Sequence, residues 1–256
     1  MLYRIENRLV YRPAKPALVT LCPPVAPPAG VEIVSIGKPK SSSQLNGWYA
    51  EAKNPRAVVL YCHGNGGDLY RCADSIAAFQ QLGLSVLAFD YSGYGLSDGE
   101  PTEENLYRDA RTARRWLARR ANVPESEIVL CGYSMGGGVA VELASTDGAK
   151  ALILERTFTT IPDVAETKVP WLPVQELMVN RFDSLSKIVK YHGPLLQTHG
   201  DADRVVPYVL GCRLHVAANE PKQFVRICGG GHADPPHRDY LIALDAFIEG
   251  LNGGAK

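Results

Sequence analysis

The sequence predicts an α/β fold, in which a mostly parallel β-sheet is covered by helices on both faces. Short continuous apolar runs, typical of strands covered on both faces, alternate with longer segments of helical period. Repeated strand–helix units favour parallel strands, because the crossover between two parallel strands leaves room for a helix. The chain has 256 residues, 46% of them hydrophobic, which is enough for a sizeable core. We therefore expect one domain across residues 1–256.

The chain is expected to begin with an irregular arm, residues 1–30, whose prolines exclude a regular helix. Val31–Ile36 and Leu45–Ala52 alternate in polarity and predict two strands joined by a turn. The continuous apolar run Ala57–Cys62 predicts the first strand that is buried on both faces. The alternation of strand and helix starts at this point.

The later elements are bounded by helix caps and glycines. Leu69–Leu82 predicts a helix ended by Gly83, and Leu84–Phe89 predicts the following strand. Thr102 is placed to cap another helix, whose apolar residues keep a helical period: Leu106, Ala110, Ala113 and Leu117. The remaining expected elements are strands at Ile128–Cys131, Ala151–Leu154, Pro194–Thr198 and Gln223–Cys228, and helices at Val139–Ala144 and Leu241–Leu251.

Residues 156–190 interrupt this alternation. The segment holds several prolines and large apolar side chains between two expected strands. A long insertion of this kind predicts a short cap or lid over the sheet. Two interpretations stay open for its apolar residues, which are either the lining of an acyl pocket or the insertion's own small core: Trp171, Leu172, Met178 and Phe182.

Charge and composition exclude some classes of partner. The 27 Lys and Arg residues balance the 27 Asp and Glu residues, which argues against a protein whose main role is to bind polyanions. One expected helix is rich in arginine, and we interpret these residues as a solvated face rather than a nucleic-acid site: Arg111, Arg114, Arg115, Arg119 and Arg120. No nucleic-acid partner is expected.

The sequence predicts neither a membrane span nor a metal site. No run approaches the ~18 apolar residues of a transmembrane helix, and charged residues occupy positions 4, 6 and 8, where a signal peptide would be apolar. We expect a cytoplasmic protein without stable membrane insertion. None of the six cysteines forms a C-x-x-C pair, so no zinc is expected. Three of them lie in apolar runs and are expected to be buried free thiols: Cys62, Cys131 and Cys228.

The candidate nucleophile is Ser134, in the G-x-S-x-G pattern of Gly132–Gly136. The pattern follows an expected strand and opens an expected helix. A sharp strand-to-helix turn strains the serine and crowds the residues two before and two after it, and glycine at both places removes the clashing Cβ atoms. The hydroxyl would then lie at a helix N-terminus, where N–H groups favour developing negative charge.

The glycine-rich stretch His63–Gly67 follows the Ala57–Cys62 strand and predicts an oxyanion hole. The expected donors are the backbone N–H groups of Asn65 and of Met135, the residue after the nucleophile. A phosphate-binding loop is the competing interpretation, but the stretch lacks the G-x-x-x-x-G-K-[ST] pattern. His63 itself is expected to pack within the loop.

A serine nucleophile needs a base. His232 follows three glycines between the Gln223–Cys228 strand and the last helix, a loop able to bring the ring over the serine. It is the expected base, and His237, which fits a turn at the start of that helix, is the fallback.

The base in turn needs an acid to orient it. Asp203, just past the Pro194–Thr198 strand, is the expected acid, and Asp201 is expected to act in the turn. Glu155, at the end of the Ala151–Leu154 strand, is the rival acid. Strand ends at one edge of a parallel sheet converge, so either carboxyl group could reach the base.

Together these residues resemble the α/β-hydrolase superfamily, and in particular its small-cap serine hydrolases, which include protein depalmitoylases and related esterases. Four ordered motifs within roughly residues 45–250 carry the resemblance: His63-Gly64-Asn65-Gly66, Asp90–Ser97, Gly132–Gly136, and the pair His199-Gly200-x-x-Asp203 and Gly231-His232. The order Ser, Asp, His matches that of the family. The resemblance implies a hydrolase of acyl substrates, with a structural role for the Asp90 segment.

The expected activity is hydrolysis of carboxylic esters or thioesters through an acyl-enzyme, with Ser134, His232 and Asp203 as the triad and with no cofactor or metal. The expected partner is a small-molecule or lipid acyl substrate. A peptidase or amidase with the same triad and a non-catalytic binding protein on a hydrolase scaffold are the alternatives. The sequence leaves the acyl-chain length, leaving group and oligomeric state open.

Overall fold

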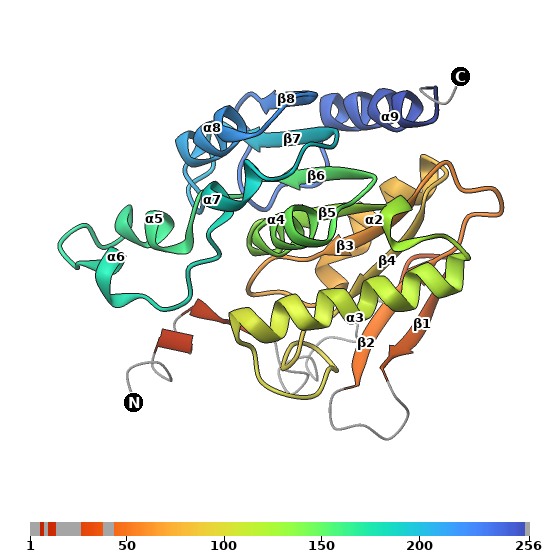
Figure 1. Cartoon of the computed structure of the whole chain (residues 1–256), viewed down its shortest axis with the longest axis horizontal. Helices are drawn as coiled ribbons and strands as arrows, with labels where there is room; N and C mark the ends of the chain where they lie inside the picture. Colours follow the sequence, from red (N-terminus) through yellow and green to blue (C-terminus); the bar gives the residue numbers. More distant parts are fainter. Residues whose placement is uncertain (1–5, 8–9, 14–26, 38–43, 254–256) are drawn as a thin grey trace.

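The computed structural model describes residues 6–7, 10–13, 27–37 and 44–253, and in this part of the chain the centre is an eight-stranded β-sheet (Figure 1). The strands lie in the order β1-β2-β4-β3-β5-β6-β7-β8. Their bounds are β1 Val31–Ile36, β2 Leu45–Ala50, β3 Val58–Cys62, β4 Ser85–Phe89, β5 Ile128–Tyr133, β6 Ala151–Glu155, β7 Leu195–Gly200 and β8 Lys222–Ile227.

Six of these strands form a parallel array, and β1 and β2 extend it antiparallel at one edge. The predicted mostly parallel α/β fold is thus confirmed. The register places Cys62 opposite Gly132, Tyr133 opposite Glu155, and Glu155 opposite Thr198. The carboxyl ends of β3, β5, β6 and β7 therefore meet at one edge, so the residues that follow these strands lie close together.

Helices cover both faces of the sheet (Figure 1). Helices α3 (Glu103–Ala121) and α4 (Met135–Asp147) cover one face, while α2 (Ala73–Gln81) and α9 (Arg238–Gly253) cover the other. Alternate strand residues belong to the two cores: Leu60 packs on the α3 and α4 side and Val59 on the α2 and α9 side. Strands β3 to β6 are buried along their whole length apart from Tyr133, which explains their continuous apolar sequences.

The helix boundaries follow the sequence signals closely. The Thr102 hydroxyl accepts a hydrogen bond from the Asn105 N–H at 3.0 Å, which confirms the predicted cap of α3. The expected helix from Leu69 begins instead as a 3₁₀ turn, η2 (Leu69–Cys72), where Asp68 caps the Tyr70 N–H. A second 3₁₀ turn, η3 (Glu125–Glu127), precedes β5, and α8 (Tyr208–Ala217) connects β7 to β8.

Two expectations about single side chains are wrong. Arg114 is not part of a solvated face: it is 1% exposed and donates hydrogen bonds to the carbonyl oxygens of Glu125 and Gly148. The stem packs in the core while the guanidinium satisfies loop carbonyls, which helical spacing alone does not reveal. Cys228 is exposed rather than buried, because β8 is an edge strand that ends at Ile227. Cys62 and Cys131 are buried free thiols as expected.

The segment 156–190 contains three short helices, α5 (Ile161–Glu166), α6 (Val174–Leu177) and α7 (Ser184–Ile188). Helices α5 and α6 project from the body of the molecule (Figure 1). Trp171 is 79% exposed and Leu172 is exposed as well, so neither of them is packed in a small core of the insertion, and Met178 is half-buried. Phe182 instead joins the main core, where its ring contacts those of Tyr11 and Tyr107.

The described residues of the N-terminal arm pack on this segment. The Glu6 carboxylate accepts hydrogen bonds from the N–H groups of Val179 and Asn180, and the Tyr11 hydroxyl donates to Asn180 Oδ1 at 2.6 Å. The prolines at 16, 23 and 24 lie outside the described residues. Within the described ranges, every helix is too short or insufficiently apolar to cross a lipid bilayer.

Replacing the cap of α3 by alanine tests the link between its sequence and its boundary. Thr102→Ala is expected to lower the free energy of unfolding by about 1 kcal/mol, because the Asn105 N–H loses its acceptor. Urea unfolding followed by circular dichroism measures the loss. Thr112→Ala is the matched control, since that hydroxyl donates to the Arg108 carbonyl and accepts from Arg115 Nη2, both within the same helix, and caps no helix end. Equal losses in both variants would contradict the capping role.

Candidate active site

Ser134 lies at a strained turn between β5 and α4. Its backbone has φ +52° and ψ −119°, values that residues other than glycine rarely adopt. A Cβ atom at Gly132 would lie 2.3 Å from the Gly136 carbonyl oxygen, and one at Gly136 would lie 1.9 Å from the Cys62 carbonyl oxygen. Both glycines of the G-x-S-x-G pattern are therefore required by backbone contacts.

Hydrogen bonds to the neighbouring strand hold this turn. The Ser134 N–H donates to the Glu155 carbonyl oxygen at 2.8 Å, and the Thr157 hydroxyl donates to the Ser134 carbonyl oxygen at 2.8 Å. A Cβ atom at Gly137 would lie 2.2 Å from the Thr157 hydroxyl, so a third glycine is needed for this contact. The serine is thus fixed at the carboxyl end of β5, and the residue is 8% exposed.

The structure brings Ser134, His232 and Asp203 into one hydrogen-bonded series. His232 Nε2 lies 3.0 Å from Ser134 Oγ, and His232 Nδ1 lies 2.7 Å from Asp203 Oδ2. The three residues come from the ends of β5, β8 and β7 respectively, which meet because the strands are parallel neighbours or near neighbours. The imidazole thus bridges the hydroxyl and the carboxyl group.

The surroundings of Asp203 keep its carboxyl group ionised. Burial acts to raise the pKa of Asp203, but hydrogen bonds from His199 and His232 and from the Val206 N–H together hold this pKa well below its ordinary value. A carboxylate only accepts hydrogen bonds, so the proton of the 2.7 Å contact is on His232 Nδ1. Nε2 is then free to accept the Ser134 hydroxyl proton.

Tyr133 and Arg156 hold the loop that carries His232, and sequence reasoning did not find either role. The Tyr133 hydroxyl donates to the His232 carbonyl oxygen at 2.5 Å. Arg156 Nη1 donates to the carbonyl oxygens of His232 and Asp234, at 2.7 and 2.6 Å. Tyr133 is the last residue of β5 and Arg156 directly follows β6, and the sequence carries no local signal for either role.

The glycine-rich loop after β3 runs beside the serine. A Cβ atom at Gly64 would lie 2.8 Å from Tyr133 Cδ1 and 3.1 Å from Ser134 Cβ, so a larger residue here would displace the Tyr133 ring. The Asn65 side chain fixes the loop: its Oδ1 accepts hydrogen bonds from the Tyr94 hydroxyl at 2.8 Å and from the Arg12 N–H at 2.9 Å. Met135 is the first residue of α4 and is buried next to the serine in the chain.

His63 packs beneath this loop rather than beside the serine. Its Nδ1 donates to the Gly64 carbonyl oxygen at 2.8 Å, and its Nε2 lies 3.7 Å from Asp90 Oδ1. Burial lowers the pKa of His63 to about 4 and raises that of Asp90 to about 6. Asp90 also accepts the Leu69 N–H at 3.1 Å, so this segment ties η2 to the loop.

Glu155, the rival acid, and His237, the fallback base, have other partners, and Asp201 lies in the turn after β7 where it was expected. Glu155 accepts hydrogen bonds from the Tyr240 hydroxyl at 2.5 Å and the Cys131 thiol, and burial raises its pKa. Asp201 accepts the Gly229 N–H and pairs with Arg226 in the turns after β7 and β8. His237 is exposed and accepts the Asp239 N–H at the start of α9.

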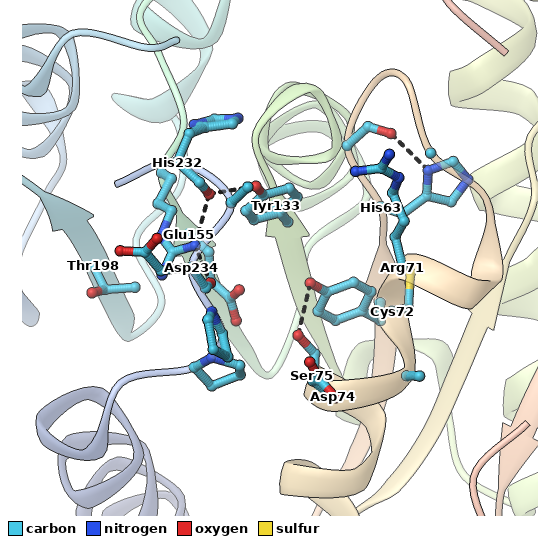
Figure 2. A pocket seen from close by; sticks show the side chains of 18 of the residues that line it. His63, Arg71, Cys72, Asp74, Ser75, Tyr133, Glu155, Thr198, His232 and Asp234 are labelled. Atoms are coloured by element: carbon cyan, nitrogen blue, oxygen red, sulfur yellow. Dashed lines mark hydrogen bonds between the residues drawn. The ribbon is translucent and has the colours of Figure 1, made fainter. Parts of the chain in front are cut away.

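A cleft of about 420 Å³ adjoins this series, with His63 and His232 among its lining residues (Figure 2). Gly64 and Asn65 also line it. It extends between η2 and α2 on one side and the Ala233–His237 loop on the other, and Glu155, Arg156 and Thr198 also contribute to its lining. Across the described residues, no three His, Cys, Asp or Glu side chains are grouped so that they could hold a metal ion.

Comparison with known proteins places the chain among hydrolases. The family described as serine aminopeptidase, S33, matches residues 53–185. An uncharacterised protein of Mycobacterium tuberculosis is 37% identical over 244 residues, covering 94% of this chain and 85% of its own. The uncharacterised protein YfhR of Escherichia coli K12 is 30% identical over 207 residues, covering 76% and 71%.

Solved esterases share the fold. The Pyrococcus furiosus esterase Pf2001 superposes with a TM-score of 0.71 at 18% identity, covering 93% of this chain and 98% of its own. Est1E from Butyrivibrio proteoclasticus, solved with ferulic acid bound, superposes with a TM-score of 0.68 at 21% identity, covering 86% and 98%. These similarities support the α/β-hydrolase fold and are too distant in sequence to assign a substrate.

Adding one methyl group at the serine turn is expected to disrupt it. Gly136→Ala should lower the free energy of unfolding by about 3 kcal/mol, because its Cβ would collide with the Cys62 and His63 carbonyl oxygens. Thermal and urea unfolding measure the change. Gly250→Ala in α9 is the control: nothing lies within 4 Å of its Cβ, and the gain in helix propensity should add up to about 1 kcal/mol. A Gly136→Ala protein as stable as wild type would refute the packing argument.

Proposed function

Because the chain belongs to the serine aminopeptidase S33 family of α/β hydrolases, we propose that it is a serine hydrolase that cleaves carboxylic esters or thioesters through an acyl-enzyme. Ser134 is the proposed nucleophile, His232 the base and Asp203 the acid that orients the base. The hydrolase family itself is established by the match, whereas the type of bond and the mechanism are the proposal.

One observation carries the proposal: a strained, nearly buried serine whose hydroxyl lies 3.0 Å from an imidazole that is itself held by an ionised carboxylate at 2.7 Å. A structural serine does not require a positive φ, three supporting glycines and an imidazole oriented in the tautomer that accepts its proton. These features together are what nucleophilic catalysis by serine needs.

In acylation, His232 Nε2 takes the Ser134 proton while Oγ attacks the carbonyl carbon. The carbonyl oxygen becomes negatively charged, and the N–H groups of Asn65 and Met135 are the proposed donors that stabilise it. Asp203 stabilises the imidazolium through Nδ1–H. The tetrahedral intermediate then collapses, His232 gives its proton to the leaving alcohol or thiol, and the acyl group stays on Ser134.

In deacylation, water occupies the place of the departed alcohol. His232 takes a proton from this water, whose oxygen attacks the acyl carbon, and then returns the proton to Ser134 Oγ as the acid product leaves. None of the proposed steps needs a metal or organic cofactor.

Two alternatives use the same site differently. The family description names an aminopeptidase, so an amide or peptide bond is the second candidate; aminoacyl anilides assayed beside matched esters distinguish the two. A non-catalytic binding role would leave Ser134 unreactive, so labelling by a fluorophosphonate probe separates it from both enzymatic activities.

Removal of the nucleophile provides the direct test. Ser134→Ala is expected to lower kcat by about 10⁴- to 10⁶-fold on aryl esters and thioesters of two to sixteen carbons, because the acyl-enzyme cannot form. Initial-rate kinetics on the series measure the loss, and the wild-type optimum indicates the length of acyl chain that the enzyme accepts. Substantial activity in the variant would rule out the mechanism.

The two candidate acids can be compared by isosteric amides. Asp203→Asn is expected to lower kcat by about 10⁴-fold, since an amide no longer fixes the tautomer of His232. Glu155→Gln should change kcat less than about tenfold, because a glutamine oxygen still accepts the Tyr240 hydroxyl away from the imidazole. Measuring kcat of both variants on one short ester identifies the acid. A larger loss of kcat in Glu155→Gln than in Asp203→Asn would assign that role to Glu155.

A further inference from the structure

The cleft beside the candidate site contains an arginine that no part of the proposed mechanism uses. Arg71, the third residue of η2, lines the cleft together with His63, Gly64 and His232. Figure 2 shows it rising from its helix toward the space between Tyr133 and His63. A Cβ atom at Gly67 would lie 2.9 Å from Arg71 Cδ, so the side chain rests against the loop that carries the proposed oxyanion donor.

The guanidinium of Arg71 is available to a ligand. Within the described part of the chain it makes no hydrogen bond and no ion pair. The second arginine of the cleft, Arg156, differs: its guanidinium is occupied by the carbonyl oxygens of His232 and Asp234. An unpaired guanidinium in a cleft next to reacting groups is suited to a carboxylate or phosphate, which it binds with two parallel hydrogen bonds.

Four acidic side chains also line the cleft, and none of them pairs with Arg71. Asp68 accepts the Tyr70 N–H, and Asp234 accepts the Gly231 N–H at 2.7 Å. Glu155 lies at the buried end, where burial raises its pKa and Tyr240 donates to it. Asp74 is exposed in the first turn of α2, a position that the helix dipole favours. Selection of an anion therefore depends on direct contact with Arg71 rather than on the overall charge of the cleft.

We propose that this cleft receives the leaving group of the substrate and that Arg71 selects leaving groups carrying a carboxylate or phosphate. This inference rests on the proposed esterase function. The leaving oxygen must depart toward His232 Nε2, which protonates it, and His232 is a wall of the cleft. A leaving group in this cleft would have its anionic end beside Arg71 and its body within a mixed lining, which includes Tyr133, Thr198 and Pro235.

Three acetate esters that differ only in one substituent test the inference: 4-acetoxybenzoate, neutral 4-acetoxybenzamide, and the 4-acetoxyphenyl trimethylammonium cation. Arg71→Gln is expected to lower the kcat/KM ratio of the anionic to the neutral ester by about 10- to 100-fold, the range of a lost hydrogen bond to a charged group. Arg71→Lys should retain part of the ratio, and Arg71→Glu should shift the preference to the cationic ester. Comparison with wild type cancels the intrinsic reactivity of each ester.

The control is Arg115→Gln, which changes an exposed arginine on α3 whose guanidinium donates to the Thr112 hydroxyl of the same helix. The kcat/KM ratio should not change. An unchanged ratio in Arg71→Gln, or a wild-type preference for the cationic ester, overturns the inference while leaving the esterase proposal intact. Selectivity that follows a carboxylate on the acyl side, tested with a succinate monoester of the neutral phenol, overturns it as well.

A binding measurement separates this inference from failure of the esterase proposal. Calorimetry of 4-hydroxybenzoate with Ser134→Ala requires no turnover, and the further change Arg71→Gln is expected to raise Kd by about tenfold or more. If no ester is hydrolysed but this difference in Kd is present, the anion site stands and the proposed reaction fails. If Kd is equal in both proteins, the anion site itself is refuted.

Discussion

The positive φ of Ser134 is the constraint around which the site is arranged. A non-glycine residue in that conformation costs about 1–3 kcal/mol, so its surroundings must hold it. The Glu155 carbonyl oxygen at the end of β6 accepts the Ser134 N–H, and the Thr157 hydroxyl, just past β6, donates to the Ser134 carbonyl oxygen. Three glycines leave room for these contacts. The parallel pairing of β5 with β6 and β3 is thus what fixes the serine turn, and with it the position of the hydroxyl.

The same parallel arrangement explains why residues distant in sequence meet. Asp203 follows β7 and His232 follows β8. The carboxyl ends of both strands lie on the same side of the sheet as that of β5, which Ser134 follows. Each loop is then fixed by contacts of its own. Val205 and Val206 N–H groups hold the Asp203 carboxylate, while Tyr133 and Arg156 hold the main chain of the His232 loop. The imidazole can therefore reach both partners without a large rearrangement.

Most of the fold and the three central side chains could be predicted from the sequence, because each has a local signal. Buried strands show as continuous apolar runs, the Thr102 cap as a threonine before an acidic first turn, and the serine turn as glycines at fixed spacing. Arg156 and Tyr133 lacked such a signal, since each acts on a loop whose position depends on the complete sheet. Arg114 and Trp171 were misjudged for a related reason: composition predicts neither a buried guanidinium that serves two loop carbonyls nor an indole left exposed on a projecting segment.

The distribution of polar and apolar residues around the serine bears on the substrate. Of the four apolar side chains of residues 156–190 that were candidates for an acyl pocket, Trp171 and Leu172 are exposed, Met178 is half-buried and Phe182 belongs to the main core. The cleft that adjoins His232 has a mixed lining, in which hydroxyl, carboxyl and guanidinium groups stand beside tyrosine rings and prolines. Burying a long alkyl group against such a wall would desolvate polar atoms without replacing their hydrogen bonds, at a cost of about 1–3 kcal/mol for each group left unpaired. A polar group that replaces the water at these atoms avoids that cost, which agrees with the proposal that this cleft receives a leaving group with an anionic end.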